Sequence, residues 1–324
     1  MTSATEDQEP VAPNKQPTRW WGWLFLVLGL MALGWILNEL GWGHVAAVLR
    51  ETAAWFPVII LLEAAWISFD SIALWQLYGP DATKIPFRTW LRSAMVAYPI
   101  MVVLPAGRAG GEVARASMFY RHVRGEAVSQ ATQLQAAVLI ANAVICIPCF
   151  IALASAVGAT HPLALLLAGN ALLTLVLGMG IVLALARTPL GRWLERRFGF
   201  ASQPGSLGGR RFLKACLATS TGRIIQTIQY AVILAAVGGS LTVSSGLISQ
   251  AIQLVGSGLG DFVPNAVGIK EGAYRIFAQT LGLKGAPERA VAIALVGRLA
   301  QFAVAALALP FQSILTTTTP DRID

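Results

Sequence analysis

The longest uncharged stretch of this chain restricts its fold more than any other feature. Residues 127–186 contain no Asp, Glu, Lys or Arg. One transmembrane helix needs about 20 apolar residues, so a stretch of this length holds two membrane spans. His161 and Pro162 mark the break between them. Because lipid offers no hydrogen bonds to the backbone, we expect an all-α polytopic membrane protein.

The other apolar stretches predict further membrane spans. Charged residues make up 12% of the chain, about half of the roughly 25% that is usual in soluble proteins. Full transmembrane helices are predicted at 20–40, 53–78, 127–157, 162–187, 213–237 and 288–315. The first 19 residues carry three prolines and three acids with few apolar residues, which predicts a disordered tail.

Two regions between these spans, 86–122 and 242–283, are poorly suited to cross a membrane. In the first, Arg92 and Pro105 bound 12 mostly apolar residues. As a helix they reach about 18 Å, against a hydrocarbon core of about 30 Å. In the second, the run 244–260 contains four glycines. We predict a re-entrant hairpin of two half helices in each region. Irregular backbone at membrane depth survives inside protein or beside water, so the hairpins should line a cavity.

Each hairpin region contains the same short pattern, in which a Glu follows a Pro by seven residues. Glu112 ends the first copy and Glu271 the second. Arg108 and Lys270 add a cation to each break, and the helix that follows presents free N–H groups, so an anion fits there. The residues predicted to break the helices are Pro105, Gly107, Gly110, Gly111, Pro264 and Gly268.

The two glutamates allow two interpretations. In one, each compensates the dipole of its helix and pairs with a base one turn later, Glu112 with Arg115 and Glu271 with Arg275. In the other, both are cavity acids that bind substrate or carry protons, because acids within a membrane are costly and are usually retained for function. The sequence leaves both interpretations open.

Further charges lie within the predicted full spans, namely Glu63, Asp70, Arg223 and Arg298. Glu63 and Asp70 are seven residues apart and share a helix face. Glu63 lies 42 residues before Pro105 and Arg223 lies 41 before Pro264. We therefore predict an ion pair between Glu63 and Arg223, which either holds helices together or gates a pathway. The residues Gln133, Gln135, Gln226, Gln229, Gln250 and Gln253 are expected to face the interior or the cavity.

The positive charges predict how the spans are oriented. The connection 187–214 carries seven Arg and Lys residues against one Glu, which is typical of a cytoplasmic loop. Counting spans outward from it places the tails 1–19 and 316–324 in the cytoplasm and makes the two hairpins enter from opposite faces. The fold is then six full transmembrane helices plus two hairpins, eight membrane segments in two inverted repeats, 20–157 and 162–315. Such repeats recur in secondary transporters.

Several classes of function are not indicated. The net charge is +8, but the basic residues flank apolar runs, so we expect no nucleic-acid partner. His44, His122 and His161 are isolated and form no metal-ligand set. We also find no phosphate-binding loop and no catalytic triad order. We expect no metal, no cofactor and no enzymatic activity.

At the two Pro-to-Glu patterns the chain resembles the membrane (flippase-like) domain of the lysyl-phosphatidylglycerol synthase family. The residues that carry the resemblance are Pro105, Gly110, Gly111, Glu112, Arg115, Pro264, Gly268 and Glu271, with spans similarly spaced over about 20–315. The second copy is poorer in glycine, with Ala266 and Val267 in its turn. The family has stand-alone members, including hopanoid-biosynthesis-associated membrane proteins, and we expect this chain to be a stand-alone member.

This resemblance implies an inner-membrane protein that moves a polar lipid, anionic or of the hopanoid type, between leaflets. We expect no synthase activity, because the soluble aminoacyl-transferring domain of full-length relatives is not in this sequence. The lipid head group would contact Arg108, Arg115, Lys270 and Arg275, with Glu112 and Glu271 as substrate or proton sites. Two alternatives remain: a transporter of a small soluble anion, and an enzyme that acts on a lipid-linked substrate with a Glu as general base.

Overall fold

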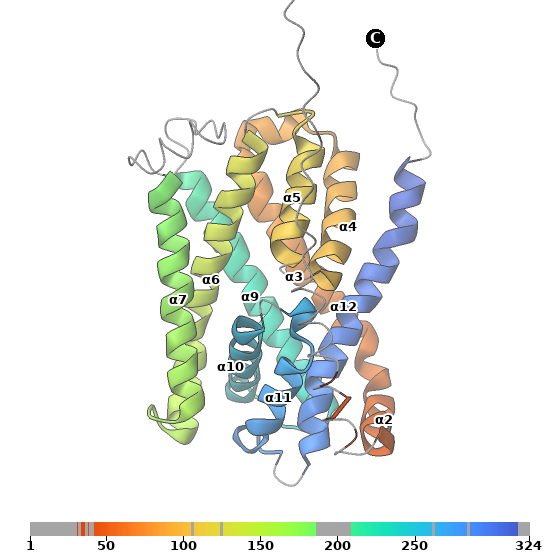
Figure 1. Cartoon of the computed structure of the whole chain (residues 1–324), viewed down its shortest axis with the longest axis vertical. Coiled ribbons are helices and arrows are strands. Elements are labelled where there is room, and N and C mark those ends of the chain that lie inside the picture. Colours follow the sequence, from red (N-terminus) through yellow and green to blue (C-terminus); the bar gives the residue numbers. More distant parts are fainter. Residues whose placement is uncertain are drawn as a thin grey trace, which may run out of the picture.

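The computed structural model describes residues 31, 34, 35, 38, 42–104, 107–123, 126–185, 209–260, 263–283 and 286–316. The predicted tail 1–19, most of the predicted span 20–40, Pro105, most of the connection 187–214 and the tail beyond 316 lie outside these residues. Within the described part of the chain every regular element is a helix (Figure 1). The predicted all-helical fold class is confirmed for this part.

The long helices run along the longest axis of the molecule (Figure 1). They are α3 (Phe56–Tyr78), α6 (Glu126–Val157), α7 (Pro162–Leu185), α9 (Arg210–Ala236) and α12 (Pro287–Thr316). Each matches a predicted span to within three residues at either end. Among the described residues, the segments long and apolar enough to cross a membrane are Trp42–Lys84, Glu126–Val157, Pro162–Leu185 and Pro287–Ala308. α9 is not among them, because its basic start and its Arg and Gln residues make it less apolar.

Short helices connect the long ones. They are α2 (Trp42–Glu51), η1 (Thr52–Trp55), η2 (Gly79–Lys84) and η4 (Ala278–Leu281). α2 and η1 lead directly into α3, so the helical segment begins well before the predicted span 53–78. Near the lower end, Arg289 of α12 donates to the carbonyl of Val237 at 2.7 Å and pairs with Glu51 at 3.2 Å. These contacts hold the ends of α2, α9 and α12 together.

The first predicted hairpin region forms two helices, α4 (Phe87–Val103) and α5 (Gly107–Phe119), which pack against each other. Both lie in the upper half of the molecule in Figure 1. α4 is longer than the predicted 12 residues because Arg88 and Arg92 lie within the helix rather than bounding it. Its 17 residues reach about 25 Å, which is still short of a hydrocarbon core of about 30 Å.

The second predicted hairpin region forms α10 (Val243–Leu259), the turn η3 (Pro264–Ala266) and α11 (Ile269–Ile276). These helices lie in the lower half of the molecule (Figure 1). The turn contacts α4, so the break of the second region meets a helix of the first. The two regions therefore approach one another from opposite ends of the molecule.

Glycine serves the two breaks differently. Gly268 has a φ of 80° and caps the start of α11, in agreement with its predicted role in the turn. Asn265 and Ala266 also have positive φ, at 49° and 50°, so this break uses a left-handed backbone without glycine. The glycines of the first copy do not form a turn. They lie inside α5, where their lack of a side chain lets the helix pack closely on α4.

This close packing predicts the effect of two matched substitutions. A Cβ atom on Gly111 would lie 2.7 Å from the carbonyl oxygen of Ala97, whereas one on Gly110 would lie 3.4 Å from the nearest atom. We expect Gly111→Ala to lower the free energy of unfolding by about 1–3 kcal/mol through overpacking. Gly110→Ala should leave it unchanged or raise it by up to about 1 kcal/mol, through helix propensity. Thermal unfolding of the purified variants in detergent compares them, and equal effects would contradict the packing role.

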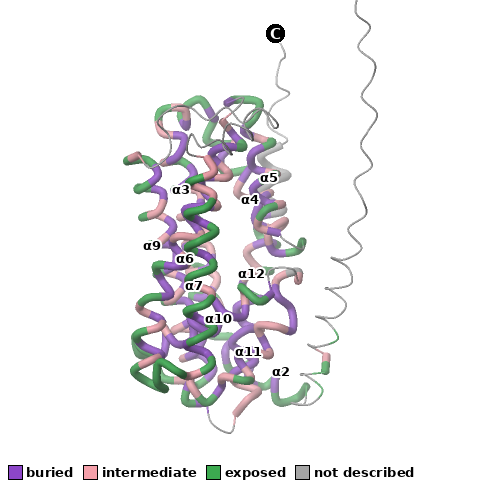
Figure 2. The backbone as a smooth tube through the Cα atoms, turned by 60° about the vertical axis from the view of Figure 1, so that its left-hand side comes forward, coloured by how far each residue is buried: buried purple, intermediate pink, exposed green. Residues whose placement is uncertain are grey.

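The apolar core is split between the two ends of the molecule. One cluster joins α6, α7, α9, α10 and α12 and includes Leu167, Ile233 and Ile252. Another joins α3, α4, α5 and α6 and includes Tyr78 and Phe119. Exposed residues lie on the outward faces of the outer helices (Figure 2). On α7 they are apolar, among them Leu165, Leu172, Leu173, Val176 and Leu183. Such a surface suits contact with lipid.

Candidate functional site

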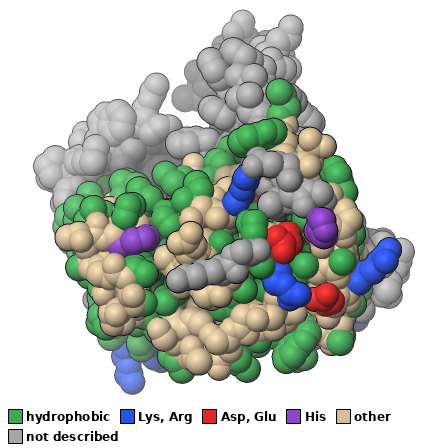
Figure 3. Space-filling model, turned by 90° about the horizontal axis from the view of Figure 1, so that it is seen from below, with side chains coloured by type: hydrophobic (Ala, Val, Ile, Leu, Met, Phe, Trp, Pro, Cys, Tyr) green, Lys and Arg blue, Asp and Glu red, His purple; other side chains and the backbone are tan. Residues whose placement is uncertain are grey.

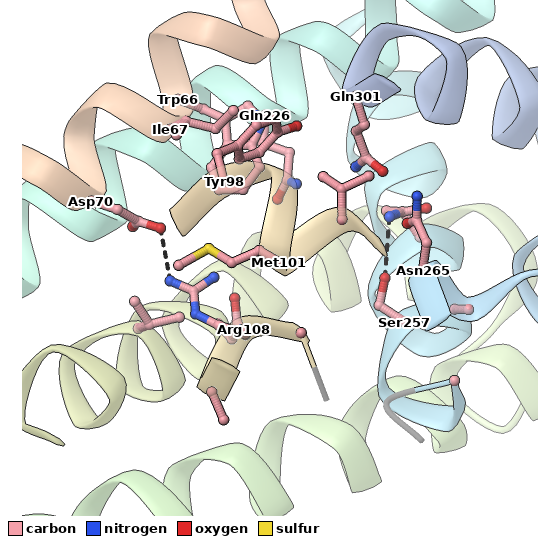
Figure 4. Close-up of a pocket in the computed structure, with 18 of the residues that line it drawn as sticks. Trp66, Ile67, Asp70, Tyr98, Met101, Arg108, Gln226, Ser257, Asn265 and Gln301 are labelled. Atoms are coloured by element: carbon pink, nitrogen blue, oxygen red, sulfur yellow. Dashed lines mark hydrogen bonds and ion pairs between the residues drawn. The ribbon is translucent and has the colours of Figure 1, made fainter. Parts of the chain in front are cut away.

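A cavity of about 530 Å³ lies where the two hairpin regions meet. Its walls come from α3, α4, α5, α6, α9, α10, α11 and α12, together with the turn η3. Figure 4 shows Tyr98 and Met101 of α4 and Arg108 of α5 on one side, with Ser257 and Asn265 on the other. The cavity that the sequence analysis expected beside the hairpins is therefore present.

The charged residues of the cavity are mainly positive. Its lining includes Arg108, Arg115, Arg223 and Lys270, with Asp70 as the acid. Uncharged polar residues complete it, namely Tyr98, Gln135, Asn142, Gln226, Gln253, Ser257, Asn265 and Gln301. Charge-assisted hydrogen bonds from Arg and Lys are the strong contacts that bind carboxylates and phosphates. The composition of the lining therefore favours an anionic group.

Arg108 and Asp70 form an ion pair at the cavity wall. The Arg108 Nη2 atom donates to Asp70 Oδ2 at 2.7 Å, and this bond joins α5 to α3 (Figure 4). The Arg108 side chain keeps 30% exposure. The sequence predicted that Arg108 contacts the ligand and that Asp70 shares a helix face with Glu63. The structure instead makes Arg108 and Asp70 partners, so Arg108 is already in part neutralised.

Arg115 and Glu112 lie one turn apart in α5, and both are nearly fully buried. The Arg115 Nη1 atom is 3.6 Å from Glu112 Oε1, an ion pair that is too long for a hydrogen bond. Arg115 Nε and Nη1 and both Glu112 oxygens have no hydrogen-bond partner among the described residues. Buried polar groups are rarely left without a hydrogen-bond partner. Arg115 lines the cavity, but these unbonded donors are enclosed by protein atoms.

Glu271 is tied into the structure by several bonds. Its carboxylate accepts two hydrogen bonds from the Arg298 guanidinium of α12, the second at 3.2 Å, and one from the backbone N–H of Gly268 at 2.9 Å. Arg298 also donates to the carbonyl of Asn265 at 3.4 Å. One of the two interpretations of the sequence paired Glu271 with Arg275, whereas in the structure the carboxylate bonds Arg298. α11 and α12 pack together, which brings Arg298 to the carboxylate.

Arg275 and Lys270 lie differently although both belong to α11. Lys270 lines the cavity and donates to Asn265 Oδ1 at 3.3 Å. The Arg275 guanidinium lies 5.9 Å from the centre of the Trp35 ring and does not line the cavity. The expectation that Arg275 contacts the same ligand as Lys270 is therefore not supported by this geometry.

Glu63 and Arg223 do not form the predicted ion pair. Glu63 accepts hydrogen bonds from Tyr98 and Gln229. Arg223 donates to Gln226 at 2.8 Å, and its guanidinium lies 5.4 Å from the centre of the Trp66 ring. Equivalent positions in the two halves need not face each other, because the rotation of each helix decides its contacts. The predicted pairing of these two residues was wrong.

Several cavity residues had a visible signal in the sequence and others had none. Gln135, Gln226 and Gln253 line the cavity as expected from polar residues within apolar helices. Tyr98 and Gln301 were missed. Gln301 is the same type of residue on a predicted span, so it could have been found. Tyr98 could not have been found, because a Tyr in an apolar segment usually indicates a residue that packs in the core or lies at the membrane interface.

A second cavity, of about 560 Å³, lies between α5, α6 and α7. Its lining is mostly apolar, with Val113, Ala116, Val128 and Ile181 among its residues, and Glu112 is its charged member. Ala109 and Gln135 line both cavities. An apolar cavity therefore adjoins the cationic one.

Comparison with known protein families gives a match over most of the chain. The model of a family described as the lysylphosphatidylglycerol synthase TM region matches residues 22–308. No curated protein and no solved structure matched the chain. The match covers nearly all of the described helices and both Pro-to-Glu patterns.

Proposed function

The chain belongs to the family of the lysylphosphatidylglycerol synthase transmembrane region, and we propose that it moves an anionic polar lipid between the two leaflets of a membrane. The observation that carries this proposal is the cavity between the hairpin regions, whose lining includes Arg108, Arg115, Arg223 and Lys270 with Asp70 as the acid. A phosphate or carboxylate head group would supply acceptors for these cations.

The adjoining apolar cavity favours a lipid over a small soluble anion. It shares Ala109 and Gln135 with the cationic cavity, so one molecule could extend from one to the other. A lipid has the matching parts: a charged head group for the cationic cavity and an acyl or polycyclic chain for the apolar one. A soluble anion would make no use of the second cavity.

The proposed transport path uses two inverted halves. α4 with α5, and α10 with α11, would be re-entrant hairpins that enter from opposite faces and meet near the midplane. Their positions in opposite ends of the molecule and the contact of η3 with α4 support this arrangement (Figure 1). Rocking of one half against the other would then open the cavity to each leaflet in turn.

In the proposed orientation, the upper end of the molecule in Figure 1 lies on the cytoplasmic side of the inner membrane. Among the described residues, this end carries Lys84, Arg88, Arg92, Arg121, Arg210, Arg211 and Lys214 against Asp81 and Glu126. At the opposite end basic and acidic side chains lie together (Figure 3). Positive residues accumulate on the cytoplasmic side of membrane proteins.

The two pattern glutamates are assigned different roles in this proposal. Glu271 holds the second hairpin to α12, since its carboxylate is already bonded by Arg298 and Gly268. Glu112 forms an ion pair with Arg115 and also lines the apolar cavity, so it keeps Arg115 in place and faces the ligand. The first hairpin therefore brings Arg115 and Glu112 to the substrate, and the second adds Lys270.

A leaflet-exchange assay tests the proposal. The purified protein is reconstituted into phosphatidylcholine vesicles that contain a trace of fluorescent phosphatidylglycerol, and an impermeant quencher reports how much label reaches the outer leaflet. We expect the protein to raise the exchange rate at least about ten-fold over empty vesicles, since uncatalysed transfer must carry a charge through hydrocarbon. Fluorescent phosphatidylcholine should exchange more slowly than phosphatidylglycerol.

Three outcomes would contradict the proposal. Lipid transport would be excluded as the function if phosphatidylglycerol and a hopanoid lipid both exchange no faster than in empty vesicles. Uptake of a soluble organic anion without lipid exchange would make the protein a solute transporter. Turnover of a lipid-linked donor that Glu112→Gln abolishes would make it an enzyme.

A further inference from the structure

The buried carboxylates of the described residues fall into two kinds. Asp70, Glu112 and Glu271 each have an Arg within ion-pair distance. Glu63 is equally buried, at 1% exposure, but its hydrogen bonds come from neutral groups. Tyr98 Oη donates to its Oε1 at 2.7 Å, and Gln229 Nε2 donates to its Oε2 at 2.7 Å. Glu63 is thus held by neutral donors in the middle of α3.

The other charged and titratable groups around Glu63 have partners of their own. From α9, Arg223 donates to Gln226, and Tyr230 stacks on Tyr274 of α11. From α12, Arg298 is bonded to Glu271. Lys270 of α11 donates to Asn265, α4 presents Tyr98, and α6 has no charged residue after Glu126. Arg223 and Lys270 act on Glu63 through space rather than through a bond.

A carboxylate without a bonded cation is expensive in a low-dielectric interior, and a proton removes that cost. Tyr98 connects Glu63 to the outside of the core, because it lines the cationic cavity. We propose that Glu63 is a proton-binding site that exchanges its proton with the cavity through the Tyr98 hydroxyl. In this step Tyr98 passes its hydroxyl proton to Glu63 Oε1 and takes a replacement proton from a hydronium ion or a protonated ligand group in the cavity, which leaves water or the ionised group behind.

The position of Glu63 links this proton to movement, if the protein transports as proposed above. Its bond to Tyr98 ties α3 to α4 of the first hairpin, and its bond to Gln229 ties α3 to α9 of the other half. Hydrogen bonds to an ionised carboxylate are about twice as strong as those to a neutral acid. Protonation of Glu63 therefore loosens both ties together, and loss of the proton restores them. The inference deepens the proposed function by naming a proton as the coupling ion.

Infrared difference spectroscopy detects the proton without any transport. Purified protein in phosphatidylcholine vesicles is titrated with acid and base, and the carbonyl-stretch band of a neutral carboxylic acid is followed. We expect this band in the wild type at neutral pH, its loss in Glu63→Gln, and its retention in Asp70→Asn. Tyr98→Phe, which keeps the shape of the ring, should shift the band and slow its exchange in heavy water.

The outcomes separate the two proposals. A band that persists in Glu63→Gln, or a Tyr98→Phe spectrum and exchange rate identical to wild type, would overturn the assignment of the proton to Glu63. In the leaflet-exchange assay, a one-unit pH difference across the membrane should change the wild-type rate by up to about ten-fold for one proton per cycle, and Glu63→Gln should not respond. A wild-type rate that does not depend on pH would overturn the coupling of the proton to transport. Absence of any lipid exchange would overturn the proposed function, but it would leave the infrared assignment of the proton to Glu63 intact.

Discussion

Arg115→Gln is expected to slow leaflet exchange of phosphatidylglycerol by about ten- to a hundred-fold, the loss that follows from one charge-assisted hydrogen-bonded contact. Arg115 is the cavity cation held least tightly, since its ion pair with Glu112 is 3.6 Å long and its Nε and Nη1 atoms have no hydrogen-bond partner among the described residues. The other cavity cations have shorter contacts: Arg108 with Asp70, Arg223 with Gln226, and Lys270 with Asn265. Removing Arg115 therefore removes the contact that a head group would use most.

The measurement is the initial rate of exchange at fixed protein-to-lipid ratio, with each variant first compared to wild type by thermal unfolding. Arg115→Lys keeps the charge but loses the planar array of donors, so we expect a rate between those of wild type and Arg115→Gln. Arg121→Gln serves as the matched control, because it removes an exposed Arg just beyond the end of α5. Its rate should match wild type.

Loss of Arg115 leaves Glu112 buried beside an uncharged side chain, and this could lower stability by itself. The double variant Glu112→Gln with Arg115→Gln removes both charges and avoids that cost. A folded double variant that exchanges phosphatidylglycerol as fast as wild type would show that the Arg115 guanidinium does not contact the head group. A double variant as slow as Arg115→Gln supports the contact.

Hydropathy was sufficient to predict the long helices, because all of them except the more polar α9 are separate, strongly apolar runs. The predicted span 127–157 became Glu126–Val157, and 162–187 became Pro162–Leu185. The same reasoning separated the two hairpin regions from the long spans. It misjudged the start of α4, because it treated Arg92 as a boundary. A long basic side chain can lie within a helix near its end and still reach water.

The partners of the charged residues could not be predicted in the same way. Spacing within one helix suggests only near neighbours as partners, and for Glu271 one interpretation therefore named Arg275. The structure gives it Arg298, 27 residues later, because α12 packs against α11. Asp70 and Arg108 are 38 residues apart and meet for the same kind of reason. Such pairs depend on how each helix is rotated in the packed structure, and no spacing rule encodes that rotation.

The glycines of the first pattern show a second limit of prediction from sequence. Glycine permits a left-handed turn and also permits two helices to approach closely, and both uses look alike in a sequence. Gly268 takes the first role and Gly111 takes the second. The neighbouring residues do not distinguish the two, since the second break achieves its left-handed backbone with Asn265 and Ala266.

Glu271→Ala is expected to lower the free energy of unfolding by about 3–5 kcal/mol, the cost of leaving one member of a buried ion pair alone. Glu271 is fully buried and Arg298 is 8% exposed. The carboxylate also bonds the N–H of Gly268, so its loss opens the cap of α11 as well. Arg298 would then retain only its long bond to the carbonyl of Asn265 as a described hydrogen bond.

Thermal unfolding in detergent measures this effect, with Glu51→Ala as the control. Glu51 also pairs with an Arg, at 3.2 Å, but its side chain is 55% exposed, so its loss should cost less than about 1 kcal/mol. The double variant Glu271→Leu with Arg298→Met removes both buried charges while keeping apolar volume, and it should recover most of the loss. Equal unfolding temperatures for Glu271→Ala and Glu51→Ala would contradict the assignment of the second pattern to stability. The second Pro-to-Glu pattern would then have to be counted, with the first, among the residues that act on the ligand.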